Sequence, residues 1–135
     1  MSEQLDELYQ EIADVLVDII PEPWKKILLY AEFQGVNENV FFYYYPMKKG
    51  EPVFSGDIPV KYKVNQDLHV QLFEELQVCF KQLWIDTRAG NDDPWTSTTF
   101  MLLHDGQMNI AFNYDDISQL SAQEKHEAWV EEHIK

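Results

Sequence analysis

The stretch from Asp92 to Asp116 reads DDPWTSTTFMLLHDGQMNIAFNYDD. It holds two apolar-rich runs on either side of residues 104–107, and an Asp-Gly pair at Asp105-Gly106 between such runs is typical of a β-hairpin turn. An acidic pair opens the stretch and another closes it. Because the first strand of an antiparallel hairpin starts beside the end of the second, all four carboxylates are expected at its open end.

An earlier stretch, PWKKILLYAEFQGVNENVFFYYY at residues 23–45, has the same layout. Each stretch has Pro-Trp, a strand, a polar turn and an aromatic-rich strand, and each follows a predicted helix. In the earlier one, strands are expected at about residues 26–33 and 40–45, with one face of the second buried and phenols on the other. Either a duplicated αββ unit or convergent hairpin patterning accounts for the likeness.

The helix before the earlier hairpin is predicted by an apolar stripe with spacings of three and four residues. It should end near Ile20, because Pro21 and Pro23 cannot continue a helix. The residues of the stripe are Leu5, Leu8, Ile12, Val15 and Ile19.

Two further helices are predicted. Asn65 is a plausible N-cap for a helix to about Asp86, whose broad apolar face includes Cys79 and marks it as the central helix of the core. A capping box of Ser121 and Glu124 starts a last helix that reaches about residue 132. Between these elements, residues 52–54 predict a short edge strand, residues 55–59 a turn, and residues 87–93 a polar loop.

These elements predict an α+β fold in the order α-β-β-(β)-α-β-β-α. The sheet should be antiparallel with about four or five strands, and helices should cover one of its faces. The 135 residues, of which 45% are hydrophobic, fit one domain over residues 1–135 with one modest core.

The charge is strongly acidic and unevenly spread. The formal net charge is -14, from 24 acidic and 10 basic residues. Residues 1–24 hold seven acids and no Lys or Arg, residues 25–85 hold seven of each, and residues 86–135 hold ten acids and three bases. Such a field repels nucleic acid and anionic membranes and attracts basic surfaces, although solubility alone also accounts for an acidic composition.

Catalytic and metal-binding motifs are missing from the sequence. The single cysteine, Cys79, excludes an internal disulfide and favours a buried structural thiol in a reducing cytoplasm. The acidic start does not resemble a secretory signal. The four histidines lack the spacing of metal ligands, and His104, His126 and His133 are interpreted as surface residues. No cofactor, metal or catalytic residue is therefore expected.

The four hairpin carboxylates, Asp92, Asp93, Asp115 and Asp116, and the more isolated Asp57 are the candidate site. Turn and cap roles account for one or two of the four hairpin carboxylates. For Asp57, a role in its own turn is the default interpretation. A Ca²⁺ site would also use carboxylates, but the EF-hand spacing is absent. Like charges so close together repel, and a basic partner would relieve that repulsion. We therefore predict that these residues bind a partner protein.

Five segments, in this order and spacing, resemble the YezG-like antitoxin or immunity family of Gram-positive bacteria. They are LYQEIADVLVDIIPEPWKKILLYAEF, VFFYYYP, GDIPVKY, PWTSTTFML and NIAFNYDD. The resemblance implies a non-enzymatic immunity protein whose partner resembles the LXG-type polymorphic toxins, with C-terminal domains that are often nucleases. It supplies no contact residues, so the predicted site rests on charge.

The resemblance and the charge lead to one hypothesis: an acidic immunity protein covers the basic active site of a cognate toxin, which we expect to be a nuclease domain. Two other classes stay open at this stage. One is an acidic adaptor unrelated to toxins, and the other is a small enzyme that uses its carboxylates in acid–base or metal chemistry. A toxin gene beside this one would discriminate among them.

Overall fold

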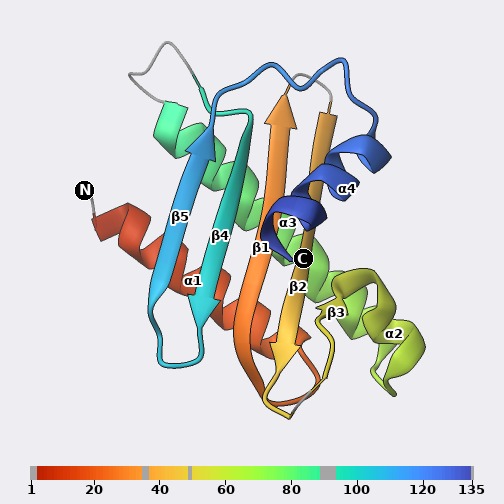
Figure 1. Ribbon diagram of the computed structural model, residues 1–135. Coiled ribbons are helices and arrows are strands. Elements are labelled where there is room, and N and C mark those ends of the chain that lie inside the picture. The colour runs from red at the N-terminus through yellow and green to blue at the C-terminus, as the bar shows by residue number, and fades with distance from the viewer. Residues whose placement is uncertain (1–2, 35–36, 49, 89–93, 135) are drawn as a thin grey trace.

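The computed structural model describes residues 3–34, 37–48, 50–88 and 94–134, and its elements follow the predicted order (Figure 1). They are α1 (Glu3–Ile19), β1 (Trp24–Gln34), β2 (Asn37–Pro46), β3 (Val53–Phe54), α2 (Ile58–Lys61), α3 (Gln66–Arg88), β4 (Ser97–Leu103), β5 (Met108–Asn113) and α4 (Ala122–His133). The predicted turn at residues 55–59 is instead a 3-10 turn, Ser55–Asp57, that leads into α2. Of the predicted polar loop, residues 87–88 extend α3 and residues 89–93 lie outside the described residues.

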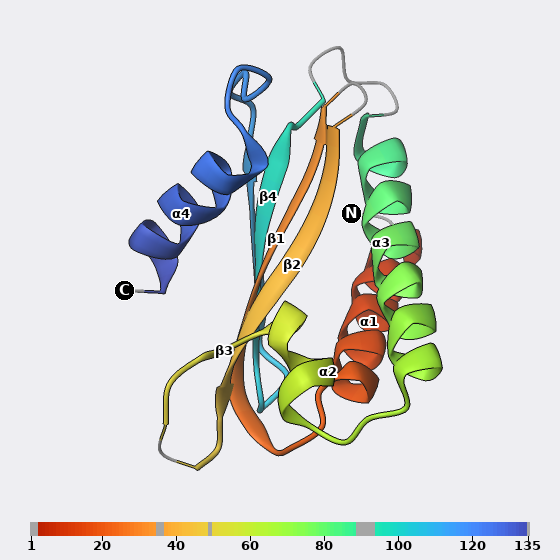
Figure 2. The same ribbon diagram turned by 90° about the vertical axis from the view of Figure 1, so that its right-hand side faces the viewer.

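The strands form one antiparallel sheet in the order β3-β2-β1-β4-β5, which confirms the predicted α+β fold. The expectation that helices cover one face of this sheet is wrong. Figure 2 shows α1 and α3 on one face and α4 on the other. Phe41 is consequently buried beneath α4, and Tyr43 and Tyr45 are half-buried rather than left on a solvent face.

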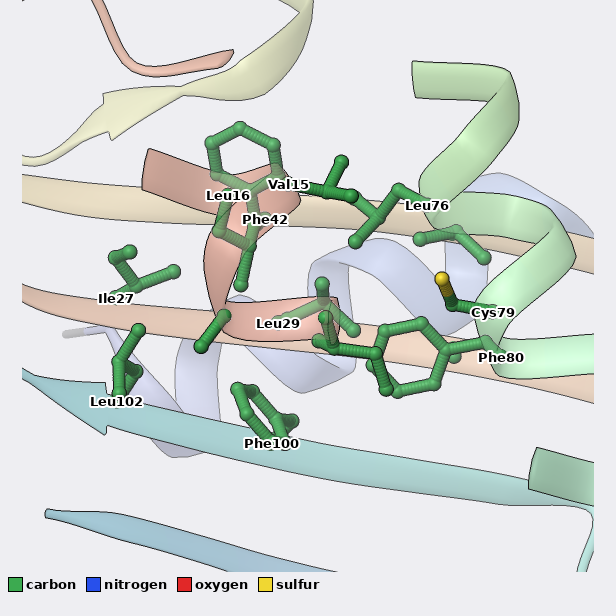
Figure 3. Close-up of a cluster of buried hydrophobic side chains, with 14 of the residues drawn as sticks. Val15, Leu16, Ile27, Leu29, Phe42, Leu76, Cys79, Phe80, Phe100 and Leu102 are labelled. Carbon is green, nitrogen blue, oxygen red and sulfur yellow. The ribbon is translucent and has the colours of Figure 1, made fainter. Parts of the chain in front are cut away.

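The main core lies between the sheet and the α1–α3 layer (Figure 3). Helix spacing directs Ile12 and Leu16 of α1 and Leu76 and Phe80 of α3 onto the alternating inward residues of the strands. Each large apolar side chain buried here contributes roughly 1.5–3 kcal/mol. Cys79 is buried in the same layer, where burial raises the pKa of its thiol to about 12. The prediction of a central helix with a structural thiol is confirmed.

The pairing of β1 with β4 helps to decide whether the two similar hairpin stretches of the sequence arose by duplication. Leu29 and Phe100 lie the same number of residues after Trp24 and Trp95, respectively, and they face each other in the middle of this strand pair. The α1-β1-β2 and α3-β4-β5 units therefore meet symmetrically, with both helices on the same face of the sheet (Figure 2). This arrangement favours duplication over convergent patterning.

The predicted local motifs are present. Gly106 has φ 94°, which a residue without Cβ adopts readily in the tight turn between β4 and β5. The Asn65 side chain accepts the N–H of Leu68 at 3.0 Å at the start of α3. Ser121 and Glu124 form the capping box that begins α4.

Candidate functional site

The open end of the β4–β5 hairpin holds two of the predicted carboxylates within the described residues, while Asp92 and Asp93 lie outside them. Asp115 and Asp116 follow β5, with Tyr114 between, and are both exposed. Asp116 Oδ1 accepts hydrogen bonds from the N–H and Oγ of Ser118 at 2.9 and 2.6 Å, and from Gln34 Nε2 at 3.0 Å. These bonds link the connection after β5 to the end of β1.

The bonds to Asp116 have an electrostatic consequence. The hydroxyl and N–H of Ser118, and then the Gln34 amide, lower the pKa of the Asp116 carboxyl because they stabilise its charged form. Asp116 thus fills one of the turn roles expected for this group. Asp115 forms hydrogen bonds through its backbone. Its carbonyl accepts from Thr96 Oγ1 at 2.6 Å, and its N–H donates to Asn113 Oδ1 at 3.0 Å.

Asp57 lies elsewhere. It is the half-buried N-cap residue of α2, and its side chain makes no capping hydrogen bond, contrary to the turn role expected by default. The pKa of the Tyr43 phenol is raised, first because the phenol is partly buried and second because the negative charge of Asp57 lies nearby. The α2 end of the sheet and the end of β5 are well separated (Figure 1), so Asp57 does not join the hairpin carboxylates.

Two helices carry many of the exposed acids. The outer side of α1 carries five exposed acids: Asp6, Glu7, Glu11, Asp14 and Asp18. Four more lie on α4: Glu124, Glu127, Glu131 and Glu132. Four of the five exposed lysines among the described residues lie at the lower end of the molecule in Figure 1, at the start of β1, after β2 and at the end of α2: Lys25, Lys48, Lys61 and Lys63. The fifth, Lys81, lies on α3.

Two residues that the sequence did not single out as a pair connect α4 to the sheet. Lys125 Nζ lies 2.6 Å from Glu32 Oε2, and the two side chains are only 7% and 1% exposed. Tyr30 donates its hydroxyl to Glu32 Oε1 at 3.1 Å. Glu32 thus points into the interface between β1 and α4.

The interpretation of His126 as a surface residue is wrong. Its ring stacks on Phe41 with centroids 4.1 Å apart, and its Nε2 shares a hydrogen bond of 2.8 Å with the Tyr43 hydroxyl. His133, at the end of α4, lies against Trp129 with centroids 5.1 Å apart. Both histidines occur on the sheet-facing side of α4, which could have been recognised only by knowing that α4 packs on the sheet.

Two adjoining grooves flank this side of α4. One, of about 730 Å³, lies between α4 and β2 and is lined by residues that include Tyr43, Glu127 and Glu131. The other, of about 470 Å³, lies along β2 between α3 and α4 and is lined by residues that include Phe73 and Glu74. Asn39 and His126 line both grooves.

The half-buried His126 predicts a pH-dependent stability. Burial lowers the pKa of its imidazole, against the smaller opposing effect of Glu127, so the folded state takes up a proton less readily than an unfolded histidine with a pKa of about 6.5. Stability should therefore be full above pH ~6.5 and fall as the pH drops below it. Denaturant midpoints measured from pH 7.5 to 5 would show this decline.

His126→Gln should flatten that decline. It should not abolish it, because burial also lowers the pKa of His69. The matched control is His104→Gln at the exposed hairpin turn, which should leave the slope unchanged. An equal slope for wild type and His126→Gln would show that the His126 stack contributes nothing to it.

Over the described residues, no group of three or more His, Cys, Asp and Glu side chains is placed to hold a metal ion. No helix in the same part of the chain has the length and apolarity that a membrane span requires.

Comparisons with known proteins identify one matching family and three similar proteins. A family model described as "Immunity protein YezG-like" matches residues 5–135. The chain is 38% identical over 127 residues to the Immunity protein YezG of Bacillus subtilis (strain 168), which covers 93% of this chain and 84% of that protein. It is 33% identical over 129 residues to the Immunity protein YezG of Bacillus spizizenii, with 94% and 80% covered. It is also 27% identical over 114 residues to the Type VII secretion system protein EsaG of Staphylococcus aureus, with 84% and 70% covered.

Proposed function

Because the chain belongs to the YezG-like immunity protein family, we propose that it neutralises its cognate toxin by covering a basic active site with an acidic surface. The toxin we propose is a nuclease domain, carried by a protein that resembles the LXG-type toxins. Neutralisation needs binding alone, so we propose no catalytic activity and no cofactor for this protein. The reduced, buried Cys79 suits a partner met in the cytoplasm.

The net charge of -14 is the observation that supports a basic target. A nuclease must attract phosphate and therefore presents a positive groove. An acidic protein repels the nucleic acid itself, competes with it for that groove, and is steered towards it at long range. The acids of α1, of α4 and of the hairpin end supply this field.

Within that field we propose the hairpin carboxylates as direct contacts. They are Asp92, Asp93, Asp115 and Asp116, with Asp57 as a separate contact beside α2. The exposure of Asp115 and Asp116 supports this. Asp116 already has three hydrogen bonds, so in the complex it would face a cation while still holding the turn.

The central test is co-expression with the toxin encoded by the neighbouring gene. Cells that express the toxin should survive only when this protein is present, and the purified pair should form a stable complex. Survival without complex formation, or a complex that leaves the toxin active, would contradict the proposed function.

The charge mechanism predicts a salt-dependent association. The Debye length shrinks from about 10 Å at 0.1 M salt to about 3 Å at 1 M, so the association rate should fall more than the dissociation rate rises. Asp92→Asn with Asp93→Asn, and Asp115→Asn with Asp116→Asn, should each weaken binding while stability holds, since Asn keeps the shape of Asp and, at position 116, an oxygen that accepts in the turn. Stopped-flow binding and thermal melting measure both quantities.

The charge-matched control for these variants is Glu51→Gln with Asp105→Asn, two exposed residues at the lower end of the molecule in Figure 1. It should leave the dissociation rate unchanged. If both hairpin variants behave like this control, the contact lies elsewhere, and the acidic side of α1 at Glu7, Glu11, Asp14 and Asp18 is the next surface to substitute.

A further inference from the structure

The edge of the sheet at β2 is incomplete. β1 pairs with β2 along its length, but on the other side β3 pairs only at Tyr43 and Tyr44. At Ser55 the chain leaves the line of β3 and enters the 3-10 turn, and Ser55 Oγ accepts the N–H of Phe42 at 3.2 Å. Among the described residues, no strand pairs with this side of β2 from Glu38 to Phe42.

The backbone groups that face this edge can be identified. The N–H of Phe42 points away from β1, because it donates to Ser55, and backbone direction in a strand repeats every second residue. Val40 and Glu38 therefore direct their N–H and C=O groups to the same side. The neighbouring strand agrees: Phe33, which faces Glu38, donates its N–H to the carbonyl of Thr96, just before β4, and not to β2.

Of these two residues, Val40 lines the 470 Å³ groove between α3 and α4, and Glu38 is exposed near the start of β2. Val40 is only 5% exposed, so its outward N–H and C=O have little access to water. A buried backbone group without a hydrogen-bond partner costs free energy, and a partner that satisfies it gains correspondingly. Figure 2 shows this part of β2 at the near edge of the sheet, between the two helices.

The walls of the grooves define the chemistry of an occupant. Three carboxylates line the two grooves, Glu74 from α3 and Glu127 and Glu131 from α4, and no Lys or Arg of the described residues does. Apolar surface lies beside them: Phe54 is half-buried, and Val70 is 54% exposed. Lys81 sits outside the lining, in an exposed ion pair of 3.6 Å with Glu38, which is a weak interaction.

We propose that an extended, lysine- or arginine-bearing segment of the toxin adds to the sheet as a strand on the open edge of β2, opposite residues 38–41. This proposal rests on the proposed function and names one part of its interface. The segment continues the line that β3 leaves at Ser55. Four residues of strand span roughly 13 Å, their backbone satisfies Glu38 and Val40, and their basic side chains reach the three glutamates of the walls.

Hydrogen exchange of the toxin complex tests the strand directly. The amide protons of Glu38 and Val40 should exchange at least about tenfold more slowly in the complex than in the free protein, because each gains a hydrogen bond. The Phe33 amide, already bonded to Thr96, is the internal reference. Unchanged exchange at Glu38 and Val40 in a complex that still neutralises the toxin would overturn the strand and leave the proposed function intact.

A charge-reversal pair tests the groove independently. Glu127→Lys with Glu131→Lys should weaken toxin binding by about tenfold or more, because both new cations meet the basic segment at short range. The control, Glu7→Lys with Glu11→Lys on α1, makes the same change in net charge on the opposite face of the sheet (Figure 2) and should mainly slow association. If the two double variants lost toxin affinity equally, and only through slower association, the groove would not be a contact.

Discussion

Replacing Lys125 with methionine should lower the free energy of unfolding by about 3–5 kcal/mol, because it leaves a buried carboxylate without its counterion. Glu32 is 1% exposed and lies 2.6 Å from the Lys125 ammonium group. The Tyr30 hydroxyl would remain as a hydrogen-bond donor to the carboxylate, but it carries no charge. Urea unfolding monitored by tryptophan fluorescence measures the loss.

The double variant Glu32→Leu with Lys125→Met should recover most of that stability. Both charges are then gone, and an apolar pair of similar volume in a buried position is often neutral or stabilising relative to the ion pair. The matched control is Lys81→Met, which breaks the exposed 3.6 Å pair with Glu38 and should cost about 0–1 kcal/mol. A Lys125→Met variant no less stable than Lys81→Met would show that the buried pair does not hold α4 to the sheet.

This ion pair also illustrates what the sequence could not predict. Apolar periodicity identified α1, and the turn and capping motifs identified the β4–β5 hairpin and the start of α4, because those patterns are local. The sheet-facing side of α4 instead mixes polar Lys125, His126 and His133 with apolar Trp129, Val130 and Ile134. Lysine and histidine usually face solvent, and here they interrupt the apolar residues, so α4 had no recognisable apolar stripe and the second covered face of the sheet went unpredicted.

The candidate site likewise has one part that local sequence patterns predict and one part that depends on tertiary contacts. The prediction that hairpin geometry places Asp115 and Asp116 just beyond β5 depends only on the order of strand and turn, and the structure confirms their position. The open edge of β2 depends on where β3 ends, and it ends because Ser55 turns away and bonds the N–H of Phe42. A serine after a two-residue strand carries no indication of such a tertiary contact in sequence.

Replacing Trp129 with alanine should cost about 3–5 kcal/mol, the usual range for truncating a buried tryptophan. Trp129 is 5% exposed and packs edge-on against Phe41 at 5.3 Å between ring centroids. Its Nε1 donates to Thr99 Oγ1 at 3.0 Å, a bond that is lost with the ring. Trp129 and Lys125 are the two buried residues of α4, and Trp129 is the apolar one, so its removal should release this helix before the sheet unfolds.

Hydrogen exchange separates local release from global unfolding. In Trp129→Ala the amides of α4 should exchange much faster while those of β1 keep most of their protection, and toxin binding should weaken because both grooves lose their α4 wall. Phe80→Ala, which opens a comparable cavity in the main core away from the grooves, is the control. It should destabilise α4 and β1 together and leave toxin affinity unchanged well below its melting temperature. If Trp129→Ala instead bound the toxin as tightly as Phe80→Ala does, α4 would not be part of the interface, and the acidic side of α1 would become the stronger candidate.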